Sequence, residues 1–277
     1  MTPSHSDSAF AGSIPQIYEQ YLVPLIFETY AADLARRVAH RHPGRVLELA
    51  AGTGVVTRHL ATTLAPDVAI VATDINEPML DEAARRGTSR PVEWRAADAL
   101  QLPFADESFD VVVCQFGVMF FPDRCKGYAE ARRVLRSGGA SGGAFIYNVW
   151  DRIEDNEFAA VVTEALQAMF PHDPPRFMAR TPHGYHDESV IRAELTAAGF
   201  TGKPAITTRL AVSRADSPRI PAVAYCQGTP LRNEIEARDR ARLGEATDIA
   251  TAAIERRFGK GIVEGRIQAK VVEIERA

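Results

Sequence analysis

Val46-Leu-Glu-Leu-Ala-Ala-Gly-Thr-Gly54 is a short apolar run that ends in a glycine-rich turn, and a stretch with helical spacing follows it at once. The spacing predicts a buried strand, a tight turn and a helix. Glycine adopts backbone conformations that other residues avoid, and a helix N-terminus offers unpaired N–H groups to an anionic group of a ligand. By itself such a turn is weak evidence for a site, because a tight strand-to-helix connection often binds no ligand.

The alternation of strand and helix continues on the C-terminal side of this turn. Short β-rich runs alternate with helical stretches as far as about Trp150, which is typical of a parallel sheet with helices on both faces. Asn76 stands where it can cap one of these helices. The strand-like runs are 45–50, 68–74, 92–97, 110–116 and 142–150, and the helical stretches are 55–65, 77–86 and 124–135.

The segments outside this alternation contain further helices and two more strands. Helical spacing over 14–40 is interrupted at Pro24, which predicts one interrupted helix or two. After Trp150 the pattern predicts helices over 156–170 and 187–198, a strand near 205–212, a helical insert to Phe258 and a last strand over 266–274. We therefore predict a single domain over 1–277, with a core at 41–150, an N-terminal lid at 14–40 and cap insertions at 151–187 and 216–261.

Acidic residues stand at the ends of the second and third predicted strands. Asp74 follows Gly54 by about 20 residues, and an ionised carboxylate there can accept hydrogen bonds from both hydroxyls of a ribose. Asp98 can accept from the exocyclic amine of an adenine, while the Ala99 N–H donates to the ring. Because the carboxyl ends of adjacent parallel strands meet at one edge of a sheet, the turn and the two acids are predicted to bind three parts of one adenosyl ligand.

In four segments the chain resembles the class I S-adenosylmethionine-dependent methyltransferases, in particular the small-molecule group that includes the ubiquinone and menaquinone biosynthesis methyltransferases. The segments are 46–54 (VLELAAGTG), 71–80 (VATDINEPML), 97–113 (ADALQLPFADESFDVVV) and 134–139 (VLRSGG). The resemblance implies an α/β fold, with a Rossmann-like, doubly wound seven-stranded sheet, an antiparallel last strand and helical cap insertions. It also implies S-adenosyl-L-methionine as the cofactor and a small molecule as the methyl acceptor.

The resemblance also implies a set of cofactor-binding residues. Glu48 would order the glycine turn and the methionine end of the cofactor, with Gly52 and Gly54 beneath it. Ala50 stands where many members of the family have the first glycine of the turn, so the fine geometry of this loop is open. The other implied residues are Asp74 (ribose), Ile75 (adenine face), Asp98 and Ala99 (adenine edge), and Gln115 and Phe116 (beside the methyl group).

The acceptor side of the site is less defined by the sequence. Tyr21 in the predicted lid is a candidate contact for the cofactor, since a ring face attracts a sulfonium, although core packing is the alternative. The methyl group is already activated, so the protein needs chiefly to align a nucleophile, and no metal is required. His183 and His186 are candidates for a general base if the acceptor must lose a proton, with ordinary loop histidines as the alternative. Aromatic residues in the inserts, among them Phe177 and Tyr185, favour a small, largely apolar or aromatic acceptor.

Two other interpretations remain open on the sequence. A nicotinamide dehydrogenase also has a glycine turn and an acid about 20 residues later, but Thr57 stands where its third glycine belongs, and Asp98 has no counterpart in its motif. A non-catalytic protein that binds adenosyl ligands would carry the same residues, because a fold does not itself prove turnover.

The composition limits the binding partners and the cellular compartment that we expect. A net charge of -4 with charges spread along the chain indicates no broad basic surface, so nucleic acid is not an expected partner. The three cysteines are widely spaced without a Cys/His cluster, which predicts no metal site and fits a reducing, cytoplasmic setting. No run approaches the roughly 20 apolar residues of a membrane span, so no membrane association is expected. A homodimer is a further hypothesis.

Overall fold

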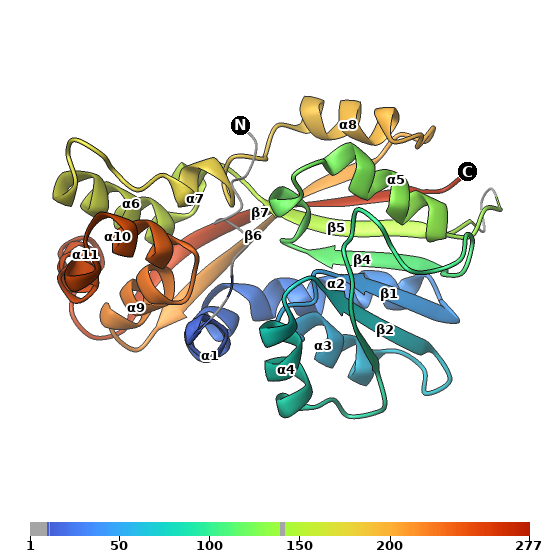
Figure 1. Cartoon of the computed structure of the whole chain (residues 1–277), viewed down its shortest axis with the longest axis horizontal. Coiled ribbons are helices and arrows are strands. Elements are labelled where there is room, and N and C mark those ends of the chain that lie inside the picture. Colours follow the sequence, from blue (N-terminus) through green and yellow to red (C-terminus); the bar gives the residue numbers. More distant parts are fainter. Residues whose placement is uncertain (1–9, 11, 139–141) are drawn as a thin grey trace. The chain divides into compact units, whose positions relative to one another are not determined.

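The computed structural model describes residue 10, residues 12–138 and residues 142–277, and these contain a seven-stranded sheet (Figure 1). The strands lie in the order β3-β2-β1-β4-β5-β7-β6. Gly139, the last residue of the fourth resembling segment, lies outside the described residues. The strand bounds are β1 Arg45–Leu49, β2 Ala69–Asp74, β3 Glu93–Ala96, β4 Val111–Gln115, β5 Ala144–Trp150, β6 Ala205–Ala215 and β7 Val263–Glu275.

Strand pairing confirms the doubly wound sheet and its antiparallel last strand. β1 pairs in parallel with both β2 and β4, and the parallel pairing continues from β2 to β3 and from β4 to β5. β7 is antiparallel to β5, since Asp151 N–H donates to the Gln268 carbonyl at one end while Arg276 N–H donates to the Gly143 carbonyl at the other. The strand order reverses between β1 and β4, and open α/β sheets bind ligands above the carboxyl ends of their strands at such a point.

Helices cover both faces of the parallel strands. On one face Thr57 of α3 hydrogen-bonds to Glu48 of β1, and on the opposite face the Tyr128 ring of α5 packs on Tyr147 of β5, with ring centroids 5.5 Å apart. α5 and α8 lie side by side above β5 in Figure 1. The helices are α1 Ile14–Ile17, η2 Tyr18–Phe27, α2 Glu28–His40, α3 Val55–Thr63, α4 Glu77–Arg86, η3 Val118–Phe120, α5 Arg124–Val134, η5 Ile153–Asp155, α6 Glu157–Met169, α7 Phe177–Arg180, α8 Glu188–Ala197, α9 Arg219–Gln227, α10 Leu231–Asp239, η6 Arg240–Arg242 and α11 Leu243–Phe258.

The first three helical elements follow one another without a break, although Pro24 lies among them. Pro24 falls inside η2, which is a π-helix, and the N–H of Glu28 donates to the carbonyl of Val23, five residues earlier. Proline lacks an N–H and crowds the carbonyl four residues before it, so a wider turn lets the chain continue helically through this position. The interruption that the sequence indicates is therefore a change of helix type.

The described residues divide into two compact units, each built from separate stretches of the chain. The helical unit contains the residues up to Glu28, Trp150–Gly184 and Arg209–Ala269, and in it α11 packs against α6 and α9. The sheet unit contains Thr29–Val149, Tyr185–Thr208 and Lys270–Ala277. The described parts of all four resembling segments lie in the sheet unit. The division into a core, a lid and two cap insertions stays a prediction.

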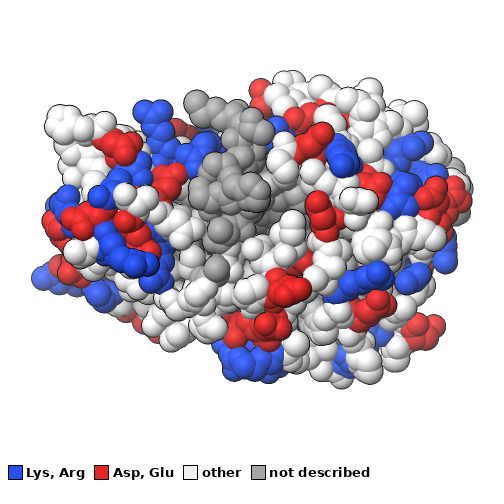
Figure 2. Space-filling view, viewed as in Figure 1, with Lys and Arg blue, Asp and Glu red and all other residues white. Residues whose placement is uncertain are grey.

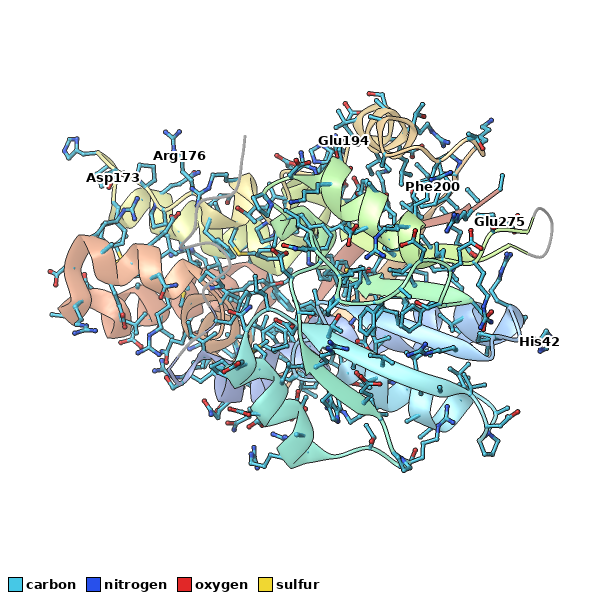
Figure 3. All side chains as sticks on the ribbon, turned by 45° about the vertical axis from the view of Figure 1, so that its right-hand side comes forward. His42, Asp173, Arg176, Glu194, Phe200 and Glu275 are labelled. Carbon is cyan, nitrogen blue, oxygen red and sulfur yellow. The ribbon has the colours of Figure 1, made fainter. Side chains whose placement is uncertain are left out.

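Tyr185 belongs to a hydrogen-bond network within the sheet unit. Its hydroxyl donates to Glu194 at 2.6 Å and lies 3.0 Å from the Tyr128 hydroxyl. Arg124 donates to both oxygens of Glu194, at 2.9 and 3.0 Å, and its guanidinium lies 4.2 Å from the centre of the Tyr185 ring. Glu194, labelled in Figure 3, thus connects α8 to α5. We assign Tyr185 to the packing of these two helices, which differs from the expectation that it contacts the acceptor.

Candidate functional site

The turn after β1 has a left-handed backbone at three positions. The φ angles are 50° at Ala50, 57° at Gly52 and 82° at Gly54. A Cβ on Gly54 would lie 2.8 Å from the Trp94 ring, so a side chain there would have to displace it. Ala50 adopts a conformation that suits glycine and costs another residue about 1–2 kcal/mol. The loop therefore keeps its shape with alanine at this position, at the expense of backbone strain.

Glu48 is buried in β1, beneath this turn. Its side chain is 1% exposed, and its carboxyl accepts a hydrogen bond from the Thr57 hydroxyl of α3 at 2.6 Å. The Arg58 guanidinium donates to the carbonyl of Thr53 in the turn at 2.7 Å. Burial raises the pKa of Glu48 to about 8, although the Thr57 hydrogen bond and the Arg58 charge act in the other direction.

Asp74 at the end of β2 is the second buried acid of the site. Its Oδ2 accepts from the Gly52 N–H at 2.8 Å, and its Oδ1 accepts from the Asn76 N–H at 2.8 Å. Burial raises its pKa, and these backbone hydrogen bonds oppose the shift. Asn76 is the N-cap residue of α4, as predicted, but its side chain donates to the same Oδ1 at 3.2 Å and makes no capping bond to the helix. Asp74 thereby joins the tip of β2 to the glycine turn.

The residues predicted to hold the adenine are accessible at the ends of β2 and β3. Ile75 is 63% exposed, which is unusual for a large apolar side chain beside a buried carboxylate. Asp98 is exposed, and its Oδ1 accepts from the Leu100 N–H at 2.9 Å. Ala99, the residue after Asp98, is half-buried. Their contacts with adenine stay predictions.

The end of β4 has a strained backbone and a buried amide that the sequence interpretation missed. Phe116 follows Gln115 with a left-handed φ of 49°, which bulky residues rarely adopt outside functional or constrained sites. Its N–H donates to Oδ1 of Asn148 at 2.8 Å, and Asn148 is fully buried on β5, paired directly with Gln115. Gln115 Oε1 and Asn148 Nδ2 are buried without a hydrogen-bond partner among the described atoms. The sequence feature that could have indicated this buried amide is Asn148 itself, a single polar residue inside the apolar run Ala144–Trp150.

The remaining predicted site residues are divided between the two units. Tyr21, half-buried on η2, and His183 belong to the helical unit, whereas His186, half-buried before α8, belongs to the sheet unit. His183 is buried, and its Nδ1 lies 2.8 Å from the carbonyl oxygen of Asp151. Because a carbonyl only accepts, Nδ1 carries the hydrogen, and in the neutral ring Nε2 carries the lone pair. The roles of Tyr21 as a cofactor contact and of either histidine as a base stay predictions.

Other features of the described residues bear on ligands and partners. Within them, no group of three His, Cys, Asp or Glu side chains is arranged to hold a metal ion. No described helix combines the length and apolar character needed to cross a membrane. Figure 2 shows basic and acidic side chains interleaved on the visible face.

Comparisons with known proteins identify the family. The Methyltransferase domain family matches residues 47–141. A demethylmenaquinone methyltransferase of Thermus thermophilus is 32% identical over 182 residues, which cover 62% of this chain and 79% of that protein. One of Deinococcus radiodurans is 42% identical over 110 residues, which cover 39% of this chain and 45% of that protein. A solved phosphoethanolamine N-methyltransferase 2 of Haemonchus contortus has the same fold, with a TM-score of 0.58 at 15% identity over 98% of this chain and 60% of that one.

The chain belongs to the class I S-adenosylmethionine-dependent methyltransferases. S-adenosylmethionine is the cofactor of this family, and the Rossmann-like fold that the resemblance implied is confirmed. Neither the dehydrogenase nor the non-catalytic interpretation finds support in these comparisons. The chain spans about half the length of the Deinococcus relative. The activity of the whole methyltransferase and its acceptor are therefore proposals.

Proposed function

We propose that this methyltransferase transfers the methyl group of S-adenosylmethionine to a small-molecule acceptor by in-line displacement. The observation that carries the proposal is the arrangement at the end of β2. There the buried Asp74 carboxyl accepts a hydrogen bond from the Gly52 N–H, and the next residue, Ile75, is exposed. An acceptor for the ribose hydroxyls beside an apolar surface for the adenine suits an adenosine.

The other residues take their proposed roles from their places around this turn. Glu48, Ala50, Gly52 and Gly54 receive the methionine end, and Asp98 with the Ala99 N–H receives the adenine edge. Gln115 and Phe116 lie at the end of β4, on the side of β1 away from β2 and β3. The methyl group and the acceptor are accordingly proposed to lie over β4 and β5, beyond the adenosine. The buried polar atoms of Gln115 and Asn148 at this end would be satisfied by a bound ligand.

The chemistry asks little of the protein beyond alignment. The nucleophilic atom of the acceptor bonds to the methyl carbon while the carbon–sulfur bond breaks, and sulfur keeps the bonding pair, which leaves S-adenosylhomocysteine. Holding the two reactants in line and excluding water supplies most of the acceleration. If the acceptor carries a proton that must leave, His183 and His186 are the proposed bases, and the hydrogen bond from His183 Nδ1–H to the Asp151 carbonyl sets the tautomer of that ring.

We propose a small, largely apolar or aromatic acceptor. The names of the Thermus and Deinococcus relatives refer to demethylmenaquinone, a quinone. The helical unit is rich in apolar side chains, but Phe158, Phe177 and Met178 are buried at 0%, 1% and 4% exposure and serve its own core. The relatives therefore support the proposal more than these side chains do.

Titration calorimetry with S-adenosylmethionine and with NAD tests the cofactor assignment, and we expect heat of binding with the first alone. Incubation of a metabolite extract with methyl-labelled cofactor then tests transfer, with label expected in the small-molecule fraction. Cofactor binding without label in any fraction would favour a non-catalytic protein, and label confined to protein or RNA would overturn the small-molecule acceptor.

A cytoplasmic setting, a homodimer and the absence of nucleic acid as a partner complete the proposal. Free thiols at Cys114, Cys125 and Cys226 support a reducing compartment. Leu210 and Val212, 63% and 61% exposed on the edge strand β6, support self-association. Light scattering of the parent and of a Leu210→Lys variant tests the dimer, and a parent that is a monomer at all concentrations would contradict it.

A further inference from the structure

Two neighbouring side-chain amides at the ends of β4 and β5 have buried atoms that lack a hydrogen-bond partner. Gln115 and Asn148 are directly paired on these parallel strands, so their side chains project from the same face of the sheet. Oε1 of Gln115 and Nδ2 of Asn148 are buried, and neither has a partner among the described atoms. An unpaired buried polar group lowers the stability of a folded protein, and most such groups are paired. An acceptor and a donor left open side by side are therefore typical of a place where a ligand completes the hydrogen bonds.

The backbone of Phe116 determines which end of the Asn148 amide is open. The Phe116 N–H donates to Oδ1 of Asn148 at 2.8 Å, and only the oxygen of an amide can accept, so the unpaired atom is the NH₂ group. Phe116 itself has a left-handed φ of 49°, and its ring meets the Tyr30 ring edge-on, with centroids 5.3 Å apart. Strained backbone of this kind is concentrated at functional sites. One end of the Asn148 amide thus holds a strained residue, and the other end is a free donor beside Gln115.

The amide pair lies where a ligand bound at the carboxyl ends of the strands can reach it. Gln115 is half-buried, so part of its side chain is accessible, whereas Asn148 is fully buried behind it. Both residues are at the edge of the sheet at which open α/β sheets bind ligands. The next turn packs closely on the proposed cofactor turn, since a Cβ on Gly117 would lie 2.5 Å from the Ala50 Cβ. The pair therefore adjoins the proposed cofactor site on the side of β4 and β5.

We propose that Gln115 and Asn148 bind a hydroxyl group on an aromatic ring of the methyl acceptor. A hydroxyl is both a donor and an acceptor, so a single oxygen atom donates to Gln115 Oε1 and accepts from Asn148 Nδ2. Because the two residues are directly paired, one atom can reach both amides. An ether or carbonyl oxygen would pair with Nδ2 alone, and an ammonium group with Oε1 alone. This inference rests on the proposed function and deepens it, because it names the polar group by which the acceptor is recognised.

Three naphthalenes separate the two hydrogen bonds. 2-Naphthol can donate and accept, 2-methoxynaphthalene can only accept, and 2-ethylnaphthalene can do neither. With S-adenosylhomocysteine bound, 2-naphthol should bind the parent about tenfold tighter than 2-methoxynaphthalene, which in turn should bind about tenfold tighter than 2-ethylnaphthalene. Each step removes one hydrogen bond and leaves its buried partner unpaired. Burial of apolar surface alone would give the reverse order, because the ethyl compound has the most apolar surface.

Replacing Gln115 by methionine removes the amide and keeps the length of the side chain. Gln115→Met should abolish the preference for 2-naphthol over 2-methoxynaphthalene. It should also leave the urea midpoint of the ligand-free protein unchanged or higher, because it removes a buried acceptor that has no partner. Gln268→Met is the matched control, since Gln268 is also half-buried but its Nε2 donates to Oδ2 of Asp151 at 2.8 Å. This control variant should keep the preference and unfold at a lower urea concentration.

Calorimetry with S-adenosylhomocysteine comes first and tests the cofactor assignment by itself, so absence of that binding overturns the proposed function together with this inference. If S-adenosylhomocysteine binds but the naphthalenes bind equally, in the order of their apolar surface or not at all, hydroxyl recognition is overturned and the cofactor assignment stands. A preference for 2-naphthol that persists in Gln115→Met also overturns it, because another group then accepts from the hydroxyl. A lower urea midpoint for Gln115→Met, or its failure to fold, does so too, because Oε1 is then paired in the ligand-free protein.

Discussion

Oδ2 of Asp74 accepts a hydrogen bond from the backbone N–H of Gly52 over 2.8 Å. The bond connects the tip of β2 to the turn after β1, residues that are 22 positions apart in the chain. One carboxylate thus shapes the turn and, in the proposed site, also receives the ribose.

Replacing Asp74 by alanine should weaken the binding of S-adenosylhomocysteine by about ten- to a hundredfold or more, because a charge-assisted hydrogen bond contributes about 1.5–3 kcal/mol. Asp74→Asn separates the two roles, since the amide oxygen can still accept from Gly52 while the charge is lost. Titration calorimetry of both variants measures the effect. An unchanged affinity in a folded Asp74→Ala protein would remove Asp74 from the cofactor site.

A side chain at Gly54 should destabilise the sheet unit by more than backbone strain alone. The φ of 82° and ψ of 26° at Gly54 are left-handed helical, so Gly54→Ala should cost about 1–2 kcal/mol of unfolding free energy from strain. It should cost about 1–3 kcal/mol more because its Cβ would meet the Trp94 ring. In a Trp94→Leu background the ring is absent, so Gly54→Ala should cost less there. Urea unfolding of the parent, the two single variants and the double variant measures the coupling, and additive losses would contradict the overlap with Trp94.

The stability of the ligand-free protein should carry a pH-dependent contribution from Glu48. The pKa of Glu48 is raised from 4.5 to about 8 on folding, so the folded state retains a proton that the unfolded chain has lost between these values. This contribution is fully present below about pH 4.5 and is lost as the pH rises to about 8, at a rate of at most about 1.4 kcal/mol per pH unit. Urea unfolding of the parent and of Glu48→Gln from pH 5 to pH 8 measures the difference. A difference that stays constant with pH would show that Glu48 is ionised in the folded protein.

The glycine turn and the strand-tip acids could be predicted from the sequence because they are local signals. Gly52, Gly54 and Asp74 stand at strand ends whose pattern is visible within a few residues, and the family resemblance fixed their order. Asn148 was missed because its role depends on Phe116, 32 residues away on a neighbouring strand. A local sequence pattern does not show which residues of separate segments come into contact, and it does not show the register that pairs Asn148 with Gln115.

The hydrogen-bond partners of Tyr185 could not be predicted for a similar reason. An aromatic residue in a loop beside apolar neighbours is compatible with a pocket or with a core, and burial alone does not separate the two. The structure shows the partners of its hydroxyl, which are the Tyr128 hydroxyl, 57 positions earlier on α5, and Glu194 on α8. The helix that would supply these partners could be predicted, but the face on which it packs could not.

Tyr185→Phe should lower the unfolding free energy by about 1–2 kcal/mol, since it leaves the Tyr128 hydroxyl and the Glu194 carboxylate each without one partner. Its affinity for S-adenosylhomocysteine should equal that of the parent, because the network lies on the face of β5 opposite Glu48. Denaturant unfolding and calorimetry together measure both quantities. A stable variant with impaired methylation of the acceptor would return Tyr185 to the acceptor site.

The final prediction concerns Ala50, the position at which this chain departs from the family's glycine. A Cβ on Gly117 would lie 2.5 Å from the Ala50 Cβ and 2.6 Å from the Cys114 sulfur. Gly117→Ala should therefore destabilise the parent, by about 1–3 kcal/mol, through overpacking. In an Ala50→Gly background one of the two close contacts disappears, so the same substitution should cost less.

Ala50→Gly alone should change stability little, because relief of the left-handed strain at φ 50° is offset by the greater freedom of glycine in the unfolded chain. Urea unfolding of the parent, the two single variants and the double variant gives the coupling between the sites, which we expect to be about 0.5–3 kcal/mol in favour of the double variant. Additive losses would show that the Cys114 sulfur alone limits the space at Gly117. A coupling of the expected sign would mean that the alanine in the cofactor turn is tolerated because its neighbour at the end of β4 has no side chain.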